Sequence, residues 1–316
     1  VEYLTSDYDS TLSNLRRRHG RDGAWHIPFW GIGNENWGCG GHMTPEYYAD
    51  LYCQYHTFVK NYGDKPMMKI ASGYGGSDTN GEDLAIFMDR TMNRRFPVKT
   101  DGISIHYYVY VRHDERHSAT QFGEDEWFTV MNMAHHIGHV IEQNTRVLDQ
   151  YDPDKRMWLI VDEWGTWYPS EPGTNPEFLY QQNSMRDAVV AALTLHIFQA
   201  HCDRVQMANI AQTVNVLQAM ILTEGDKIVL TPTYHVFNML QKHQDATLLP
   251  IDLECDAYGQ GDDKLPAISA SGRAVAPWVA PTPMPTSAAM LIWQMPISEE
   301  ALPARSGKGI SAAACA

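Results

Sequence analysis

Short apolar runs in this chain alternate with longer segments whose pattern predicts helices. Runs of this length are typical of strands buried in a parallel sheet. Cap residues mark the helix boundaries: Thr44-Pro45-Glu46 supplies an N-cap side chain, a proline at the first helical position and an acid in the first turn. The pattern predicts strands at residues 28–34, 67–72, 102–106, 157–163 and 204–210, and helices at 7–19, 45–62, 82–95, 124–150, 178–200 and 232–241.

Alternating strands and helices predict an α/β fold with a parallel sheet. A closed (β/α)₈ barrel needs three more strands, so either the sheet is open or the first three β/α units are absent from this chain. From Ala246 the pattern changes to short alternating stretches that predict an antiparallel β appendage. We therefore expect a partial barrel at 1–243, a β region at 244–270, and an irregular or altered tail rich in Ala and Pro at 271–316.

Charge and composition narrow the choice of partners. The formal net charge of −14 argues against nucleic acid and against an anionic membrane surface, because both attract clustered Lys and Arg. A neutral polysaccharide is compatible with that charge, and 16 Tyr and 9 Trp suit stacking on sugars, although most aromatic residues of any enzyme are core. No apolar run approaches the ~18–20 residues that span a bilayer.

The five cysteines are odd in number and scattered, which is a poor framework for disulfides or for zinc. They favour a reducing compartment, and we expect a cytoplasmic location. The chain begins at Val1 without the basic and apolar regions of a leader peptide, and without an initiating Met, so this start is not taken as the natural one.

Two of the predicted strands end at a glutamate followed by a turn. Glu35 ends the run that begins at Phe29, and Glu163 ends the run that begins at Met157. The carboxyl ends of parallel strands are where α/β enzymes place their chemistry. Two carboxyl groups on either side of a sugar are the minimum for cleaving a glycosidic bond, with one as general acid and the other as nucleophile, and repulsion and burial are expected to raise one pKa. A structural ion pair is the alternative for each glutamate.

Other polar and aromatic residues are expected around the pair. His106 and Tyr108 end a strand and point the same way because the strand period is two; a Tyr108 hydroxyl would keep a carboxylate ionised. Asn34 precedes Glu35 and is able to hydrogen-bond a sugar hydroxyl. The remaining candidates, each with ordinary packing or loop hydrogen bonding as the alternative, are the amides Asn209 and Gln212 and the indoles Trp37, Trp164 and Trp167.

Other catalytic patterns are weak or missing. His135 and His139 are spaced i and i+4, but no glutamate follows the first, so a solvated helix face is favoured over a metalloprotease site. The glycine loops lack dinucleotide-binding spacing, and neither a Walker sequence nor a GxSxG elbow is present.

The longest motifs closely resemble glycoside hydrolase family 51, the α-L-arabinofuranosidases. The resemblance covers about residues 20–270 in order and is carried by these runs: Trp30-Gly31-Ile32-Gly33-Asn34-Glu35-Asn36-Trp37-Gly38-Cys39-Gly40-Gly41, Ile105-His106-Tyr107-Tyr108, Val161-Asp162-Glu163-Trp164-Gly165-Thr166-Trp167-Tyr168, Asn209-Ile210-Ala211-Gln212-Thr213-Val214-Asn215 and Thr231-Pro232-Thr233-Tyr234.

The resemblance implies a (β/α)₈ TIM-type barrel with a C-terminal β-sandwich and a retaining double displacement. It implies that Glu35 is the acid/base and Glu163 the nucleophile, that Asn34 contacts the sugar 2-hydroxyl, and that His106, Tyr108 and Gln212 belong to the site. The five strands would be the fourth to eighth of the barrel, with the first three, which bring another glutamate and an asparagine to the sugar, missing and the β-sandwich truncated.

The expected function is release of terminal α-L-arabinofuranosyl groups from arabinan- or arabinoxylan-type polysaccharides and oligosaccharides, with no metal or organic cofactor. The expected partner is such a saccharide, with no nucleic acid and no membrane, and a homo-oligomer is left open. Three alternatives remain: a related barrel β-xylosidase or endoglucanase, a non-catalytic carbohydrate-binding remnant, and a structural protein that binds no sugar.

Overall fold

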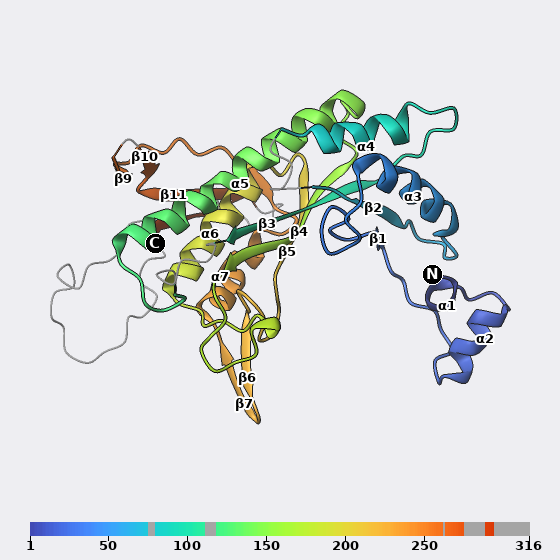
Figure 1. The fold of residues 1–316 in the computed structure, drawn as a ribbon, viewed down its shortest axis with the longest axis horizontal. Coiled ribbons are helices and arrows are strands. Elements are labelled where there is room, and N and C mark those ends of the chain that lie inside the picture. The colour runs from blue at the N-terminus through green and yellow to red at the C-terminus, as the bar shows by residue number, and fades with distance from the viewer. Residues whose placement is uncertain (75–79, 111–117, 262, 275–287, 294–316) are drawn as a thin grey trace, which may run out of the picture. The chain divides into compact units, whose positions relative to one another are not determined.

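The five-stranded sheet of the protein is parallel, and its strands lie in the order in which they occur along the chain. The computed structural model describes residues 1–316 except 75–79, 111–117, 262, 275–287 and 294–316 (Figure 1). Strand β1 pairs in parallel with β2, and β2 with β3, in a five-stranded sheet of order β1-β2-β3-β4-β5. Its strands are β1 (Phe29–Ile32), β2 (Met68–Ser72), β3 (Gly102–Tyr110), β4 (Trp158–Trp167) and β5 (Val205–Ile210).

A helix follows each strand of this sheet along the chain, and after β5 a short hairpin precedes the helix. The prediction of alternating strands and helices with a parallel sheet is therefore confirmed, and the sheet is part of a (β/α)₈-type barrel. In chain order these helices are α3 (Pro45–Phe58), α4 (Glu82–Met92), α5 (Glu124–Tyr151), α6 (Met185–Ala200) and α7 (Pro232–Leu240).

Several boundaries differ from the prediction for identifiable reasons. Helix α6 begins at Met185 rather than at residue 178, because Ser184 and Asp187 form a capping box that fixes the helix start. The chain before it contains the short 3₁₀ helix η2 (Pro176–Phe178). Strands β3 and β4 each continue four residues beyond the predicted end, so the residues after Glu163 are strand and not turn.

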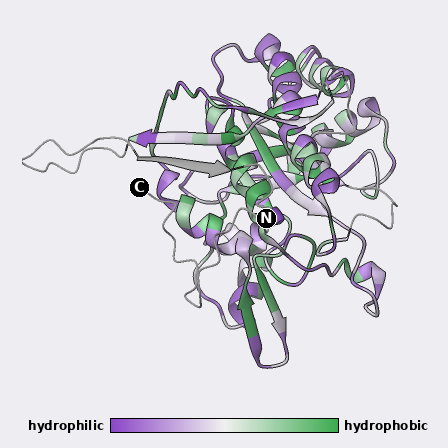
Figure 2. Ribbon diagram, turned by 90° about the vertical axis from the view of Figure 1, so that its left-hand side faces the viewer, coloured by the Kyte–Doolittle hydropathy of each residue, from purple (hydrophilic) through white to green (hydrophobic). Residues whose placement is uncertain are grey.

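Short elements were not predicted. They are α1 (Glu2–Thr5), the 3₁₀ helix η3 (Gln241–His243), and a hairpin of β6 (Ile221–Glu224) and β7 (Lys227–Leu230). The predicted helix at 7–19 is α2 (Thr11–Arg18). Figure 2 shows apolar residues along the hairpin, and Ile228 there is 65% exposed.

The C-terminal region is antiparallel, as its alternating pattern predicted. One sheet has the order β12-β11-β8, and a second pairs β9 with β10. Strand β12, which pairs with β11, lies inside the range 271–316 for which an irregular tail was expected. The strands are β8 (Thr247–Leu249), β9 (Ala257–Gln260), β10 (Asp263–Pro266), β11 (Ile268–Ala274) and β12 (Ala288–Trp293).

The chain divides into two compact units, and strands β3, β4 and β5 contribute residues to both. The first unit comprises Val1–His106, Val140–Asp162 and Asp203–Met207, and the second Tyr107–His139, Glu163–Cys202 and Ala208–Ala316. The domain boundaries expected from the sequence divide the chain into consecutive ranges, whereas the two units are defined by contacts in space. The expected boundaries therefore stay a prediction.

Each unit has its own buried apolar cluster. In the first, α3 and α4 lie side by side (Figure 1), and Tyr52 meets Phe87 edge-on with ring centroids 5.4 Å apart. In the second, Val130 and Met131 of α5 are buried with Val190 and Leu193 of α6. Within the described part of the chain, every helix is too short or too polar to cross a membrane.

Candidate active site

The loop after β1 is a tight turn that fixes Glu35. The backbone N–H groups of Gly38 and Gly40 both donate to the carbonyl oxygen of Glu35, at 2.8 and 3.0 Å. A Cβ atom at Gly40 would lie 1.7 Å from the carbonyl oxygen of Asn34, so the turn requires glycine at that position. Glu35 itself has φ of 39°, a left-handed conformation that is uncommon for a side-chain-bearing residue and is found preferentially at functional sites.

Buried polar groups connect this loop to β2. Asn36 is 1% exposed and donates to the hydroxyl of Tyr74 at 2.9 Å, while it accepts from the hydroxyl of Ser72 at 2.9 Å. The hydroxyl of Tyr48 on α3 donates to the carbonyl of Ile32 and accepts from the backbone N–H of Ser72. These bonds hold the end of β1 beside the end of β2, and the sequence pattern did not single out any of the four side chains.

The Glu35 carboxylate has two side-chain partners in the first unit. The Cys39 thiol donates to Oε2 at 2.9 Å, and Nδ1 of His106 lies 2.9 Å from Oε1. The other ring nitrogen of His106 lies 3.2 Å from Oδ1 of Asp162. The contact with Asp162 is an ion-pair distance and not a hydrogen bond, because Oδ1 of Asp162 accepts no hydrogen bond from the described residues. His106 was expected to bind the sugar, but in this structure it forms a hydrogen bond with Glu35.

The pKa of Glu35 is lowered. Burial raises it, but the hydrogen bonds from Cys39 and His106, together with the charge of His106, outweigh that effect. The sequence predicted that burial and repulsion raise the pKa of one of the two acids. The groups of the first unit have the opposite net effect on Glu35. Its neighbours favour the ionised carboxylate.

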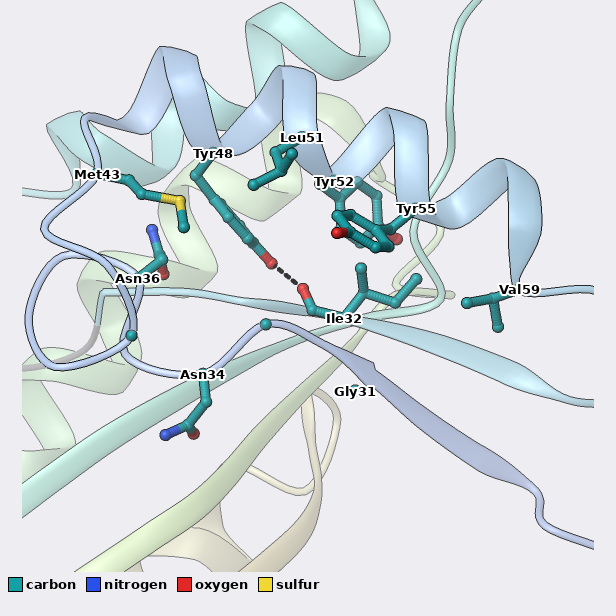
Figure 3. Close-up of a pocket in the computed structure, with 12 residues that line it drawn as sticks. Gly31, Ile32, Asn34, Asn36, Met43, Tyr48, Leu51, Tyr52, Tyr55 and Val59 are labelled. Carbon is teal, nitrogen blue, oxygen red and sulfur yellow. Dashed lines mark hydrogen bonds between the residues drawn. The ribbon is translucent and has the colours of Figure 1, made fainter. Parts of the chain in front are cut away.

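The apolar cavity beside this loop is separate from the Glu35 carboxylate. It measures about 330 Å³ and lies between the end of β1 and α3, with Met43, Tyr48 and Leu51 on its helix side (Figure 3). The Asn34 side chain points away from that helix (Figure 3) and is exposed to solvent. Trp37 is half-buried, and its indole N–H donates to the Gly73 carbonyl at 3.3 Å.

In the second unit, Tyr108 and Glu163 form the other pair. The Tyr108 hydroxyl donates to Oε2 of Glu163 at 2.8 Å, as the His-x-Tyr pattern predicted for one of the carboxylates. Trp167 meets the Tyr108 ring edge-on, with centroids 5.0 Å apart, and contacts Tyr110 in the same way. Trp167 is therefore the indole that lies beside this pair.

Trp164 corrects an expectation. It was expected to line a sugar subsite, but it is 1% exposed and packs between Phe198 of α6 and Phe237 of α7, with ring centroids 5.3 and 5.9 Å away. The reason is strand periodicity, since residues 164 and 163 point to opposite faces of β4. Trp164 belongs to the core of the second unit.

Gln212 follows β5 and is exposed. Its position is fixed through the backbone, because the N–H of the preceding Ala211 donates to the carbonyl of Trp164 at 3.0 Å and its own N–H donates to Val216 at 3.2 Å. The side chain of Asn209 is also exposed. The placement leaves both amides available to a solute.

A buried polar network supports the end of β4 and was not found from the sequence. Gln218 accepts from the backbone N–H of Thr166 at 2.8 Å, and its amide donates to the carbonyl of Asp187 and to the hydroxyl of Thr233. The Thr166 hydroxyl donates to Asp187 at 2.6 Å, and Gln181 accepts from the N–H of Tyr168 at 2.8 Å. Gln218 thus ties β4 to helices α6 and α7.

We expect the Gln218→Ala substitution to lower the free energy of unfolding by about 3 kcal/mol, since it leaves buried donors and acceptors without partners at roughly 1–3 kcal/mol each. Urea unfolding followed by circular dichroism measures this. Gln244→Ala, which removes the same side chain at an exposed position, is the matched control and should change stability by less than about 0.5 kcal/mol. Equal stability of the two variants would contradict a supporting role for the network.

Comparison with known proteins finds that this chain is similar to α-L-arabinofuranosidases. Residues 162–304 match the family model for the α-L-arabinofuranosidase C-terminal domain. An intracellular exo-α-L-arabinofuranosidase from Bacteroides ovatus is 49% identical over 273 residues, which cover 86% of this chain and 52% of that protein. The chain spans about half the length of the curated relatives it matches.

Solved structures agree. The GH51 arabinofuranosidase from Xanthomonas axonopodis pv. citri superposes with a TM-score of 0.81 and 47% identity, over 86% of this chain and 54% of that one. A family 51 α-L-arabinofuranosidase from Bifidobacterium longum, at 22% identity and a TM-score of 0.71 over 86% of this chain and 56% of its own, shares the fold.

The parallel sheet and these likenesses place the chain in the TIM-barrel class. Within that class, the chain belongs to glycoside hydrolase family 51, the family of the α-L-arabinofuranosidases.

Proposed function

We propose that this chain supplies the two catalytic carboxylates of a retaining exo-acting α-L-arabinofuranosidase, with Glu163 as nucleophile and Glu35 as acid/base. The observation that carries the assignment is the hydrogen bond from Tyr108 to Glu163. A phenol that donates to one carboxylate oxygen fixes the orientation of the group, as a nucleophile requires. The names of the relatives support the choice of sugar.

The proposed reaction has two displacements. In the first, Glu163 attacks the anomeric carbon while Glu35 gives its proton to the glycosidic oxygen, so that one C–O bond forms as the other breaks. In the second, Glu35 takes a proton from water, and the water oxygen displaces Glu163 from the sugar. The sugar leaves with its anomeric configuration retained, and both carboxyl groups return to their starting protonation.

This mechanism requires the two carboxyl groups to flank one bond at about 5–5.5 Å. It also explains how Glu35 acts as an acid despite neighbours that favour its ionised form. At that separation the negative charge of Glu163 would favour the protonated form of Glu35 in the first displacement, and covalent attachment of the sugar would remove that charge for the second. Cys39 and His106 then stabilise the ionised base.

We include in the proposal that Asn34, Trp37 and Gln212 contact the sugar, and that the substrate is an arabinose-containing oligosaccharide or polysaccharide. The exposed amides would accept and donate hydrogen bonds to hydroxyl groups without adding charge. The Bacteroides ovatus relative is named intracellular. Action in the reducing cytoplasm fits the thiol state of Cys39, Cys53, Cys202 and Cys255.

The test is hydrolysis of an aryl α-L-arabinofuranoside by this chain, with the first-formed anomer followed by proton NMR. We expect release of the arabinofuranose with retained configuration, and much weaker turnover of aryl β-xylosides and β-glucosides. Release of the inverted anomer would refute the double displacement. Preferential cleavage of the xyloside would favour the related barrel β-xylosidase instead.

We expect Tyr108→Phe to lower kcat by about 10- to 100-fold with little change in KM, because the variant loses a donor to the nucleophile but keeps the ring that packs on Trp167. Steady-state kinetics on the aryl arabinofuranoside measure it. Tyr47→Phe, which removes an exposed hydroxyl, is the matched control. A Tyr108→Phe enzyme with full kcat would contradict the assigned role of the hydrogen bond.

A further inference from the structure

Cys39 occupies an unusual place for a cysteine beside a candidate acid/base. The glycines at 38, 40 and 41 shape the turn, so that the chain reverses and residue 39 faces back toward residue 35. Its thiol reaches Oε2 of Glu35 at 2.9 Å, while His106 from β3 contacts the other oxygen. The two carboxylate oxygens thus have different donors from different elements.

We propose that Cys39 is a positioning residue for Glu35: its thiol fixes Oε2 and favours the ionised form that activates water in the second displacement. The inference deepens the proposed function and rests on it. A thiol is a weak donor, so it stabilises the ionised carboxylate without preventing Glu35 from taking up the proton that the first displacement needs.

Other charged groups near Glu35 also influence how readily its carboxylate ionises. His106 contacts the carboxylate directly, and Asp162 from β4 lies behind the ring of His106. Both remain when Cys39 is changed. The lowered pKa of Glu35, to which the thiol hydrogen bond contributes after burial has raised it, has the direction that the proposal requires.

The first measurement is the pH profile of kcat/KM for the wild-type chain, Cys39→Ala and Cys39→Ser. Its basic limb reports the loss of the proton from the acid in the free enzyme. Without a donor, the ionised form is less stable, so we expect the basic limb of Cys39→Ala to move up by about half a pH unit or more. The Cys39→Ser hydroxyl still donates, so its limb should stay near that of the wild type. A limb that moves in neither variant, or equally in both, would overturn the proposal.

The second measurement needs no turnover. Iodoacetamide alkylates thiolates, and the rate at each cysteine is read by mass spectrometry of its peptide. In Glu35→Gln the negative charge beside the Cys39 thiol is gone, so we expect the rate of Cys39 relative to exposed Cys255 to rise at least about threefold. Glu142→Gln, which removes an exposed charge on α5, should leave that ratio unchanged.

An unchanged ratio in Glu35→Gln would overturn the coupling between Cys39 and Glu35. The two tests also separate this proposal from the one on which it rests. If the chain hydrolyses no arabinofuranoside, the proposed function fails, while the alkylation ratio still decides whether the thiol and the carboxylate act on each other.

Discussion

The Glu163→Gln variant is expected to lose turnover of an aryl arabinofuranoside by about 10⁴-fold or more, equivalent to about 5.5 kcal/mol of transition-state stabilisation. The amide oxygen of the glutamine is too weak a nucleophile to form the covalent sugar intermediate. Substrate binding should be largely kept, since the change is nearly isosteric. Steady-state kinetics and calorimetric binding of arabinose or substrate separate these two effects.

Two controls make this prediction specific. Glu177→Gln changes an exposed glutamate of the same unit and should retain full turnover. Glu163→Ala leaves room for a small anion, so added azide should restore part of the activity and form a glycosyl azide of inverted configuration. A Glu163→Gln chain that turns over like the wild type would remove Glu163 from the mechanism.

The sequence predicted the strands that carry chemistry because their signal is local. A short apolar run followed by an acid indicates a strand and an acid on or near it. Glu35 follows β1 as predicted, whereas Glu163 and the His-x-Tyr pair lie inside β4 and β3 rather than at their ends; Tyr108 contacts a carboxylate as expected. The hairpin at 221–230 was missed, since its exposed apolar residues do not form the alternation of a half-buried strand.

Strand periodicity distinguishes the two tryptophans of β4, Trp164 and Trp167. The period of two that places His106 and Tyr108 on one face also places Glu163 and Trp167 together and Trp164 opposite them. Applied to β4, it would have assigned Trp164 to the core, where it packs on Phe198 and Phe237. The prediction for Trp164 was wrong because β4 was expected to end at Glu163. The alternation of side chains between two faces applies only to residues inside a strand, so it was not applied to Trp164.

The support of the site could not be predicted because it is made by contacts distant in sequence. Gln218 lies 52 residues from Thr166, and Asn36 lies 38 residues from Tyr74. Each of these side chains is an ordinary polar residue in the sequence. Only folding shows that they are buried and paired, and a buried polar group without its partner would be costly.

The Glu35→Ala variant should show an effect that depends on the leaving group. A saccharide leaves as a poor, basic alkoxide and needs the proton of an acid, so we expect turnover of an arabino-oligosaccharide to fall by about 10³-fold or more. A nitrophenolate leaves without protonation, so the first displacement of a nitrophenyl arabinofuranoside should fall much less. Kinetics on the two substrates, compared with Glu142→Gln as the exposed control, measure the difference.

The second displacement distinguishes Glu35 from Glu163. Without a base to activate water, the sugar attached to Glu163 is released slowly in Glu35→Ala, so we expect a burst of nitrophenol and a covalent adduct detectable by mass spectrometry. Azide needs no base and should attack that adduct, accelerating release and giving a glycosyl azide of retained configuration. An inverted azide would exchange the two roles, because inversion follows only from direct attack on the substrate, in the absence of the nucleophile. Equal losses on both substrates without an adduct would contradict Glu35 as acid/base.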